Sequence, residues 1–185
     1  MTKTKTWDKV SLGIALIGLG VILVVGSFGV KRSQSNTFAS EPVKVEGFSV
    51  KDAPLEKLPV RILIPALSID LEVKPARNIN GYWEVFSDSA AWGEGSGLPG
   101  EQGNQVIYAH ARRGLFLPLK GVQEGMKIYV FSSNNWYLYE VSQIKEVTPT
   151  QVGVIAPTED ETLTLYTCSG FADSKRLIVI AKKAS

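Results

Sequence analysis

The strongest constraint on the fold is a series of short apolar runs that fills the chain from Leu58 to its carboxyl end. The runs are rich in β-branched and aromatic residues, and turn residues such as the Asn-Gly of "NINGYWEV" separate them. Eight runs are expected to be strands: "VRILIP" (60–65), "IDLEVK" (69–74), "YWEVF" (82–86), "QVIYAH" (105–110), "KIYVFS" (127–132), "WYLYEVSQIKEV" (136–147), "TLTLYTC" (162–168) and "RLIVIAKK" (176–183). No long apolar period of 3.6 residues follows residue 57, so helices should be short. This pattern predicts a mostly β fold, an eight-stranded closed or nearly closed β-barrel.

The amino-terminal part has a different character, because residues 10–30 are uncharged and mostly apolar. Twenty-one helical residues, at a rise of about 1.5 Å each, can cross a hydrocarbon core of about 30 Å. We expect an uncleaved transmembrane helix here, and a removed signal peptide is the alternative. Three lysines and the terminal amine precede the run, whereas Lys31 and Arg32 follow it, which favours a cytoplasmic amino end.

These features divide the chain into four segments. Residues 1–9 are expected in the cytoplasm, and residues 10–30 anchor the chain in the cell membrane as a single-pass helix. Residues 31–57 mix Ser, Lys, Glu and Pro without sustained periodicity and are expected to form a tether. Residues 58–185 are expected to form the barrel, which this orientation places on the extracellular side.

Charge argues against a nucleic-acid partner. The net charge of the chain is +2, but five basic residues and one acidic residue surround the apolar run. The rest of the chain holds 15 basic and 17 acidic residues, without a basic block. Nucleic-acid binding domains usually carry a clustered positive surface, so we expect none here.

The chain contains one cysteine, Cys168, and one histidine, His110. Taken singly, the cysteine could be a small buried apolar residue and the histidine a surface residue at a strand end. A hairpin between "TLTLYTC" and "RLIVIAKK", with its turn centred on residues 171–173, would place Cys168 directly opposite Arg176. Opposed residues on antiparallel strands share a face, with Cα atoms about 4.5–5.5 Å apart. Lys175 would point to the other face.

This arrangement suits nucleophilic catalysis. The thiolate is the reactive form of cysteine, and a cationic neighbour such as Arg176 favours it over the thiol. The guanidinium also offers several donors to a developing oxyanion. A nucleophilic cysteine needs an acid–base partner, and His110 supplies the single imidazole of the chain.

These residues resemble the motifs of sortases, the cysteine transpeptidases of Gram-positive cell surfaces. Thr164 to Cys168 read T-L-Y-T-C, which matches the T-L-x-T-C signature, and Arg176 stands where the family's arginine follows the cysteine. "PGEQGNQVIYAH" is similar to the stretch that leads to the family's histidine, although Ala109 stands where Gly is frequent. The resemblance extends from about Leu58 to the carboxyl end and includes the amino-terminal anchor.

The resemblance implies a sortase-type barrel that cleaves an LPxTG-like sorting motif in surface proteins and transfers them to an amine of the cell envelope. Cys168 would attack the threonine carbonyl and form a thioester. His110 would protonate the leaving amine and later deprotonate the incoming one, and Arg176 would bind the substrate carbonyl or the oxyanion.

Further residues are expected to bind the substrate. Thr164 and Tyr166 share the face of Cys168 by the period of two, and Thr167 belongs to the same motif. By the resemblance, the loop of residues 148–160 helps to hold the sorting signal. No cofactor or metal cluster is indicated, and a calcium site in a loop stays open.

Two other functions stay open from the sequence. A membrane-anchored barrel without turnover would serve as a binding or scaffolding protein. A pilin-polymerising sortase would usually carry a carboxyl-terminal span and a lid with an Asp-Pro-aromatic motif. The sequence contains neither feature, so the protein-anchoring type is expected.

Overall fold

The computed structural model describes residues 43–45 and 53–184. All described residues belong to one compact unit of the chain, within residues 40–185. The transmembrane helix predicted at residues 10–30 therefore lies outside the described residues. Within the described ranges, no helix is long and apolar enough to span a bilayer.

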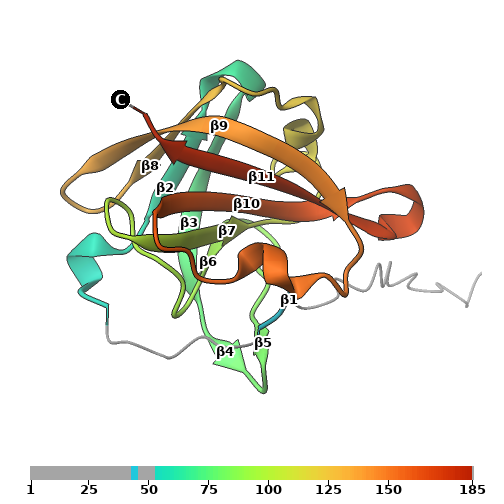
Figure 1. Ribbon diagram of the computed structural model, residues 1–185, viewed down its shortest axis with the longest axis horizontal. Coiled ribbons are helices and arrows are strands. Elements are labelled where there is room, and N and C mark those ends of the chain that lie inside the picture. Colours follow the sequence, from blue (N-terminus) through green and yellow to red (C-terminus); the bar gives the residue numbers. More distant parts are fainter. Residues whose placement is uncertain (1–42, 46–52, 185) are drawn as a thin grey trace, which may run out of the picture. The chain divides into compact units, whose positions relative to one another are not determined.

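Eight strands form a closed barrel, as the sequence predicts (Figure 1). In the order in which they pair, they are β10 (Glu161–Ser169), β11 (Lys175–Lys183), β9 (Trp136–Val147), β8 (Lys127–Phe131), β2 (Arg61–Ile64), β3 (Ile69–Ala76), β6 (Ala90–Gly93) and β7 (Gly103–Tyr108). Neighbours are antiparallel except at β3–β6 and β7–β10, where the strands run parallel. The β7–β10 pair closes the barrel and brings together two segments that are distant in sequence.

A small sheet accompanies the barrel. It consists of β1 (Val43–Lys44), β5 (Tyr82–Trp83) and β4 (Asn78–Ile79). The Asn-Gly turn between β4 and β5 is confirmed, with positive φ at both Asn80 and Gly81. β1 belongs to the stretch that the sequence assigns to a tether, and it pairs with β5 through Val43 and Trp83.

One expected barrel strand is wrong in position. The run at residues 82–86 supplies only β5, and the barrel strand comes instead from "AAWG" (β6), which is buried at all four positions. Trp83 lies so close to Gly93 that a Cβ there would come within 2.5 Å of the indole ring. Since "AAWG" is short and does not alternate between apolar and polar, its pattern gave no strand signal.

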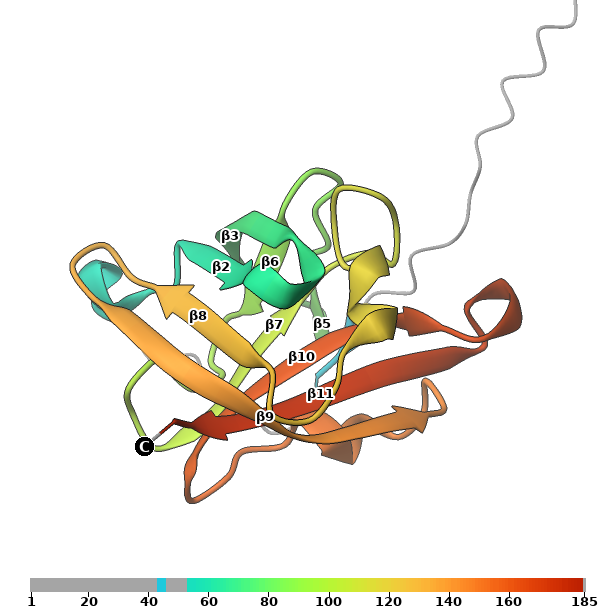
Figure 2. The same cartoon turned by 90° about the horizontal axis from the view of Figure 1, so that it is seen from above.

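The helices are short, as expected. The described residues form five 3₁₀ helices: η1 (Leu55–Lys57), η2 (Pro65–Leu67), η3 (Leu117–Gly121), η4 (Val152–Ile155) and η5 (Phe171–Asp173). The last of these forms the turn of the β10–β11 hairpin, whose tip extends away from the barrel in Figure 2.

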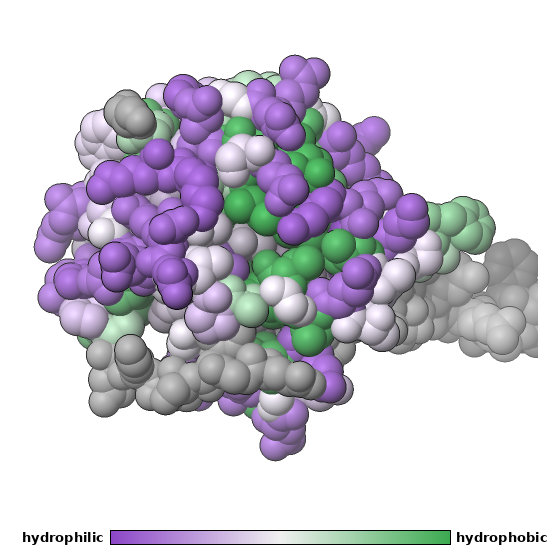
Figure 3. All heavy atoms as spheres, viewed as in Figure 1, coloured by the Kyte–Doolittle hydropathy of each residue, from purple (hydrophilic) through white to green (hydrophobic). Residues whose placement is uncertain are grey.

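Two apolar clusters stabilise the molecule on opposite faces of the central strands. The larger one fills the barrel and includes Ile107, Phe116, Leu163 and Leu165. The smaller one covers the outer face of β7 and β10 and includes Val43, Trp83, Val106, Tyr108 and Ile155. Apolar side chains gather in the middle of the face seen in Figure 3, in a band that crosses the strands. β10 is therefore a central strand with both faces covered, and its carboxyl end is fixed in position.

Candidate active site

The β10–β11 hairpin brings Cys168 and Arg176 opposite each other. The register pairs Cys168 with Arg176 and Ser169 with Lys175, and η5 occupies residues 171–173. The hairpin geometry predicted from the sequence is thus confirmed. Lys175 lies on the other face, where its ammonium is 3.3 Å from a carboxylate oxygen of Glu146.

The turn of this hairpin has an unusual backbone. Gly170 has a φ of 76°, and a Cβ added there would lie 2.8 Å from the Ser174 hydroxyl oxygen. Ala172 and Asp173 also have positive φ, at 50° and 59°. Such values are unfavourable for alanine, so the packing of the turn determines this conformation.

His110 reaches the same region through the parallel pairing of β7 with β10. That pairing ends at Tyr108 and Tyr166, and the amide of Ala109 then donates to the Tyr166 carbonyl at 3.3 Å. The hydroxyl of Thr167 donates to the Ala109 carbonyl at 2.7 Å. Since both chains continue side by side, His110 follows Ala109 as Cys168 follows Thr167.

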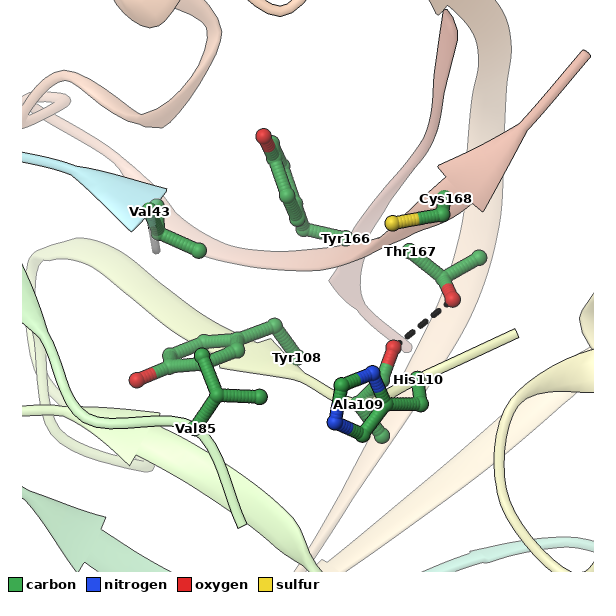
Figure 4. Close-up of a pocket in the computed structure, with 8 residues that line it drawn as sticks. All are labelled: Val43, Val85, Tyr108, Ala109, His110, Tyr166, Thr167 and Cys168. Carbon is green, nitrogen blue, oxygen red and sulfur yellow. Dashed lines mark hydrogen bonds between the residues drawn. The ribbon is translucent and has the colours of Figure 1, made fainter. Parts of the chain in front are cut away.

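Cys168 and His110 line the same hollow on the outer face of these two strands (Figure 4). Its other lining residues are Val43, Val85, Tyr108, Ala109, Tyr166 and Thr167. Apolar side chains surround the thiol and the imidazole, which are both partly exposed. The hollow therefore brings a nucleophile and a proton carrier together in largely apolar surroundings.

Arg176 is not among the residues that line this hollow. The residue is buried and only 3% exposed. Nε donates to the hydroxyl of Tyr166 at 3.1 Å, and Nη1 donates to the carbonyl of Asp173 at 2.6 Å. The guanidinium therefore connects the turn to Tyr166, which does line the hollow.

The three expected substrate-binding residues have different surroundings. Tyr166 and Thr167 line the hollow, although the hydroxyl of Thr167 is engaged by Ala109. Thr164 is buried, and its hydroxyl donates to the side-chain oxygen of Asn104 at 2.7 Å. Asn104 in turn donates to the carbonyl of Ala156 at 3.0 Å, so Thr164 helps to position the loop of residues 148–160.

Some lining residues were not identified from the sequence. Tyr108 stands two residues before His110, so the period of two could have placed it on the same face. Val43 and Val85 gave no such signal, because they come from short irregular segments and reach the hollow only through tertiary packing.

The surroundings of His110 favour its neutral imidazole. Burial lowers the pKa of His110 below 6.5, and the positive charge of Arg112 lowers it further. Asp173 opposes both effects and raises the pKa. A base with a lowered pKa gives a more acidic conjugate acid, which suits proton donation to a leaving amine.

We expect the His110 pKa to respond to these two charges in opposite directions. Arg112→Gln should raise the pKa, because a repelling cation is removed, and Asp173→Asn should lower it. His110 is the single histidine of the chain, so its imidazole proton resonances can be followed without assignment. Arg61→Gln, on β2, is the control and should leave the His110 pKa unchanged. An unchanged His110 pKa in both test variants would show that the charges of Arg112 and Asp173 do not affect the imidazole.

The described part of the chain contains no group of three or more His, Cys, Asp or Glu side chains that could hold a metal ion.

Comparison with known families supports this interpretation. The family model of the sortase domain matches residues 62–184. Sortase A of Bacillus anthracis is 30% identical over 137 residues, which cover 71% of this chain and 63% of that protein. The chain thus spans less than two thirds of the length of this relative.

Solved structures agree with the fold. A lid mutant of sortase A from Corynebacterium diphtheriae is 27% identical, with a TM-score of 0.59 and coverage of 73% of each chain. Sortase C of Streptococcus pneumoniae, at 23% identity, has a TM-score of 0.63 and covers 77% of this chain and 80% of its own. A sortase A and a sortase C both match, so the fold does not show which of these two types the chain resembles more.

Proposed function

Because the chain belongs to the sortase family, we propose that it is a membrane-anchored cysteine transpeptidase. Its substrates would be surface proteins with an LPxTG-like sorting motif, and its acceptor an amine of the cell envelope. The observation that carries this proposal is the shared hollow of Cys168 and His110. The placement of Arg176 in register with Cys168 supports it.

In the first half of the proposed reaction, the thiol proton passes to His110 and the thiolate attacks the threonine carbonyl of the motif. The tetrahedral oxyanion then collapses, the bond between threonine and glycine breaks, and the imidazolium gives its proton to the leaving amine. A thioester between Cys168 and the threonine results. The lowered pKa of His110 favours this proton transfer.

In the second half, the acceptor amine attacks the thioester. His110 accepts a proton from the attacking amine, an amide bond forms, and the sulfur leaves as a thiolate. The proton on His110 returns to Cys168, so the enzyme regains its starting state. Water in place of the amine would give hydrolysis.

Arg176 supports the site through its fork of donors. We expect Arg176→Lys to lower kcat by about 10²–10³-fold, because an ammonium cannot reproduce both the bond to Tyr166 and a donor for the oxyanion. Peptide cleavage assays measure the change. Arg61→Lys, at an exposed ion pair with Asp70, is the matched control and should keep its activity.

A trapping experiment tests the proposal. The full chain in detergent micelles is mixed with a peptide that contains an LPxTG motif, quenched in acid and analysed by mass spectrometry. We expect a mass increase equal to the amino-terminal half of the peptide, located on Cys168 and released by hydroxylamine. A barrel that only binds or scaffolds would show neither the adduct nor cleavage.

We favour the protein-anchoring type over a pilin polymerase. The 30% identical relative is a sortase A. Supplying the chain with a sorting-motif protein and either a small cell-wall amine or a pilin subunit would distinguish the two types. A pilin subunit used as the better acceptor would favour the polymerase.

Membrane topology can be tested with single thiols in a Cys168→Ala background. We expect Ser35→Cys to react with a membrane-impermeant maleimide on intact cells, because residues 31–57 should lie outside. Thr4→Cys, in the expected cytoplasmic segment, should react only after lysis. The reverse pattern would place the catalytic domain inside.

A further inference from the structure

A second hollow lies on the opposite side of the strand that carries the nucleophile. Its volume is about 330 Å³, and its lining consists of Lys120, Glu146, Ser169, Gly170 and Leu177. Ser169 follows Cys168 directly but points to the other face of β10, as successive strand residues do. None of these residues has a role in the mechanism above.

The lining of this second hollow includes a buried hydroxyl group, that of Ser169. Ser169 is 3% exposed, and its Oγ makes no hydrogen bond to any described residue. The hydroxyl and Lys175 lower the pKa of Glu146, so that carboxylate lies close to Ser169 without the geometry of a hydrogen bond. A buried polar group without a partner is costly, which points to a ligand or water that completes it.

The charges around the second hollow favour an anion. Lys175 forms an ion pair with Glu146 at 3.3 Å, which compensates that carboxylate. Lys120 lies in the last turn of η3, and its charge also lowers the pKa of Glu146. Two ammonium groups thus face one carboxylate beside the Ser169 hydroxyl, which leaves one positive charge in excess. A ligand carboxylate would match both groups, and Leu177 would contact its apolar stem.

The two hollows lie on opposite faces of the same end of β10. The pairing of β7 with β10 ends at Tyr166, whereas Cys168 and Ser169 pair only with β11. β7 therefore ends before these two residues, and the chain that follows it, from Ala109, continues beside the end of β10. An extended peptide of three residues reaches at most about 10–11 Å, which is enough to pass one strand end.

We propose that the second hollow binds a carboxylate group of the amine acceptor. The acceptor would place its carboxylate on Lys120 and Ser169 and extend its amine past the end of β10 toward the thioester on Cys168. The inference rests on the proposed transpeptidase function, and it names a substrate class: amines that also carry a carboxylate a few bonds away.

The test compares two acceptors that differ only in this charge. Triglycine and triglycinamide are offered to the full chain in detergent micelles, together with a sorting-motif peptide. We expect the KM of triglycine to be about 10-fold lower than that of triglycinamide, because a charge-assisted hydrogen bond is lost in the amide. Lys120→Gln should remove this preference, and Ser169→Ala should reduce it.

Lys145→Gln is the matched control. Lys145 precedes Glu146 on β9 and therefore points to the other face, so this variant should keep the preference. Equal KM values in the wild-type chain, or a preference that survives Lys120→Gln, would overturn the carboxylate site.

A binding measurement separates this inference from the proposed function. The ¹⁵N-labelled Cys168→Ala chain is titrated with each peptide, and the amide signal of Gly170 is followed. A dissociation constant about 10-fold lower for triglycine supports the site even if no thioester ever forms. Equal constants, or no shift at Gly170, would overturn the site whether or not the enzyme turns over.

Discussion

Cys168→Ala should abolish cleavage of a sorting-motif peptide, with a loss on the order of 10⁴-fold or more in kcat/KM. The methyl group cannot form a thioester, and no other thiol exists in the chain to replace it. His110 would still be able to transfer protons, but without a nucleophile its contribution cannot be used, since such groups act as a unit. Peptide cleavage and intact-protein mass spectrometry measure the loss.

The fold should survive this substitution. Cys168 is only partly buried, so loss of its sulfur leaves a small cavity. An unchanged far-ultraviolet spectrum and melting temperature would show that activity was lost for chemical reasons. Ser142→Ala, on β9, is a control for substitution of a small side chain. Normal turnover by Cys168→Ala would contradict the transpeptidase proposal and favour a scaffolding role.

The hairpin at the site was predictable because its geometry is local. Eight positions separate Cys168 from Arg176, and a turn of five residues leaves one possible partner for each. Alternation then determines which side chains share a face. The buried position of Arg176 was not predictable, because it depends on the strained turn and on Tyr166.

Contacts between distant segments were harder to anticipate. The pairing that places His110 beside Cys168 is parallel, and no turn connects the two strands, so its register cannot be counted along the sequence. The resemblance suggested that these residues meet, and the structure provides the reason. Val43 could not be predicted as a site residue. It lines the hollow, but its two-residue strand carries no sequence pattern.

The barrel itself was predictable to the number of its strands, although one of them was misplaced. The strand at residues 136–147 has the predicted bounds, because its run is long and rich in β-forming residues. β6 was missed because its four residues are all buried and do not alternate between apolar and polar, so the sequence gives no sign of a strand there. Its place depends on Trp83, whose ring packs on Gly93 from another sheet.

The pH profile should assign the acid–base work to His110. The active state of the proposed mechanism carries one proton on the pair of Cys168 and His110. Forms with two protons or none are inactive, so kcat/KM should be bell-shaped, with limbs that belong to the coupled pair. The lowered pKa of His110 reduces the share of imidazolium at pH 7, and Arg112→Gln should increase it.

His110→Ala should depress kcat/KM by about 10²–10⁴-fold and remove the limb that depends on the imidazole. The measurement is kcat/KM of the full chain from about pH 5 to pH 10, a range that covers the reference values of histidine and cysteine. Arg112→Gln is the matched control, since it should shift the profile without removing a limb.

The leaving amine gives a second test of His110→Ala. Alanine leaves the thiol in place, so thioester formation should continue slowly. It should become limited by the leaving amine, which then departs without a proton donor. A donor peptide with a more acidic leaving amine should therefore recover part of the lost rate in His110→Ala but gain little in the wild type. An unchanged profile, or no such recovery, would remove His110 from the proposed mechanism.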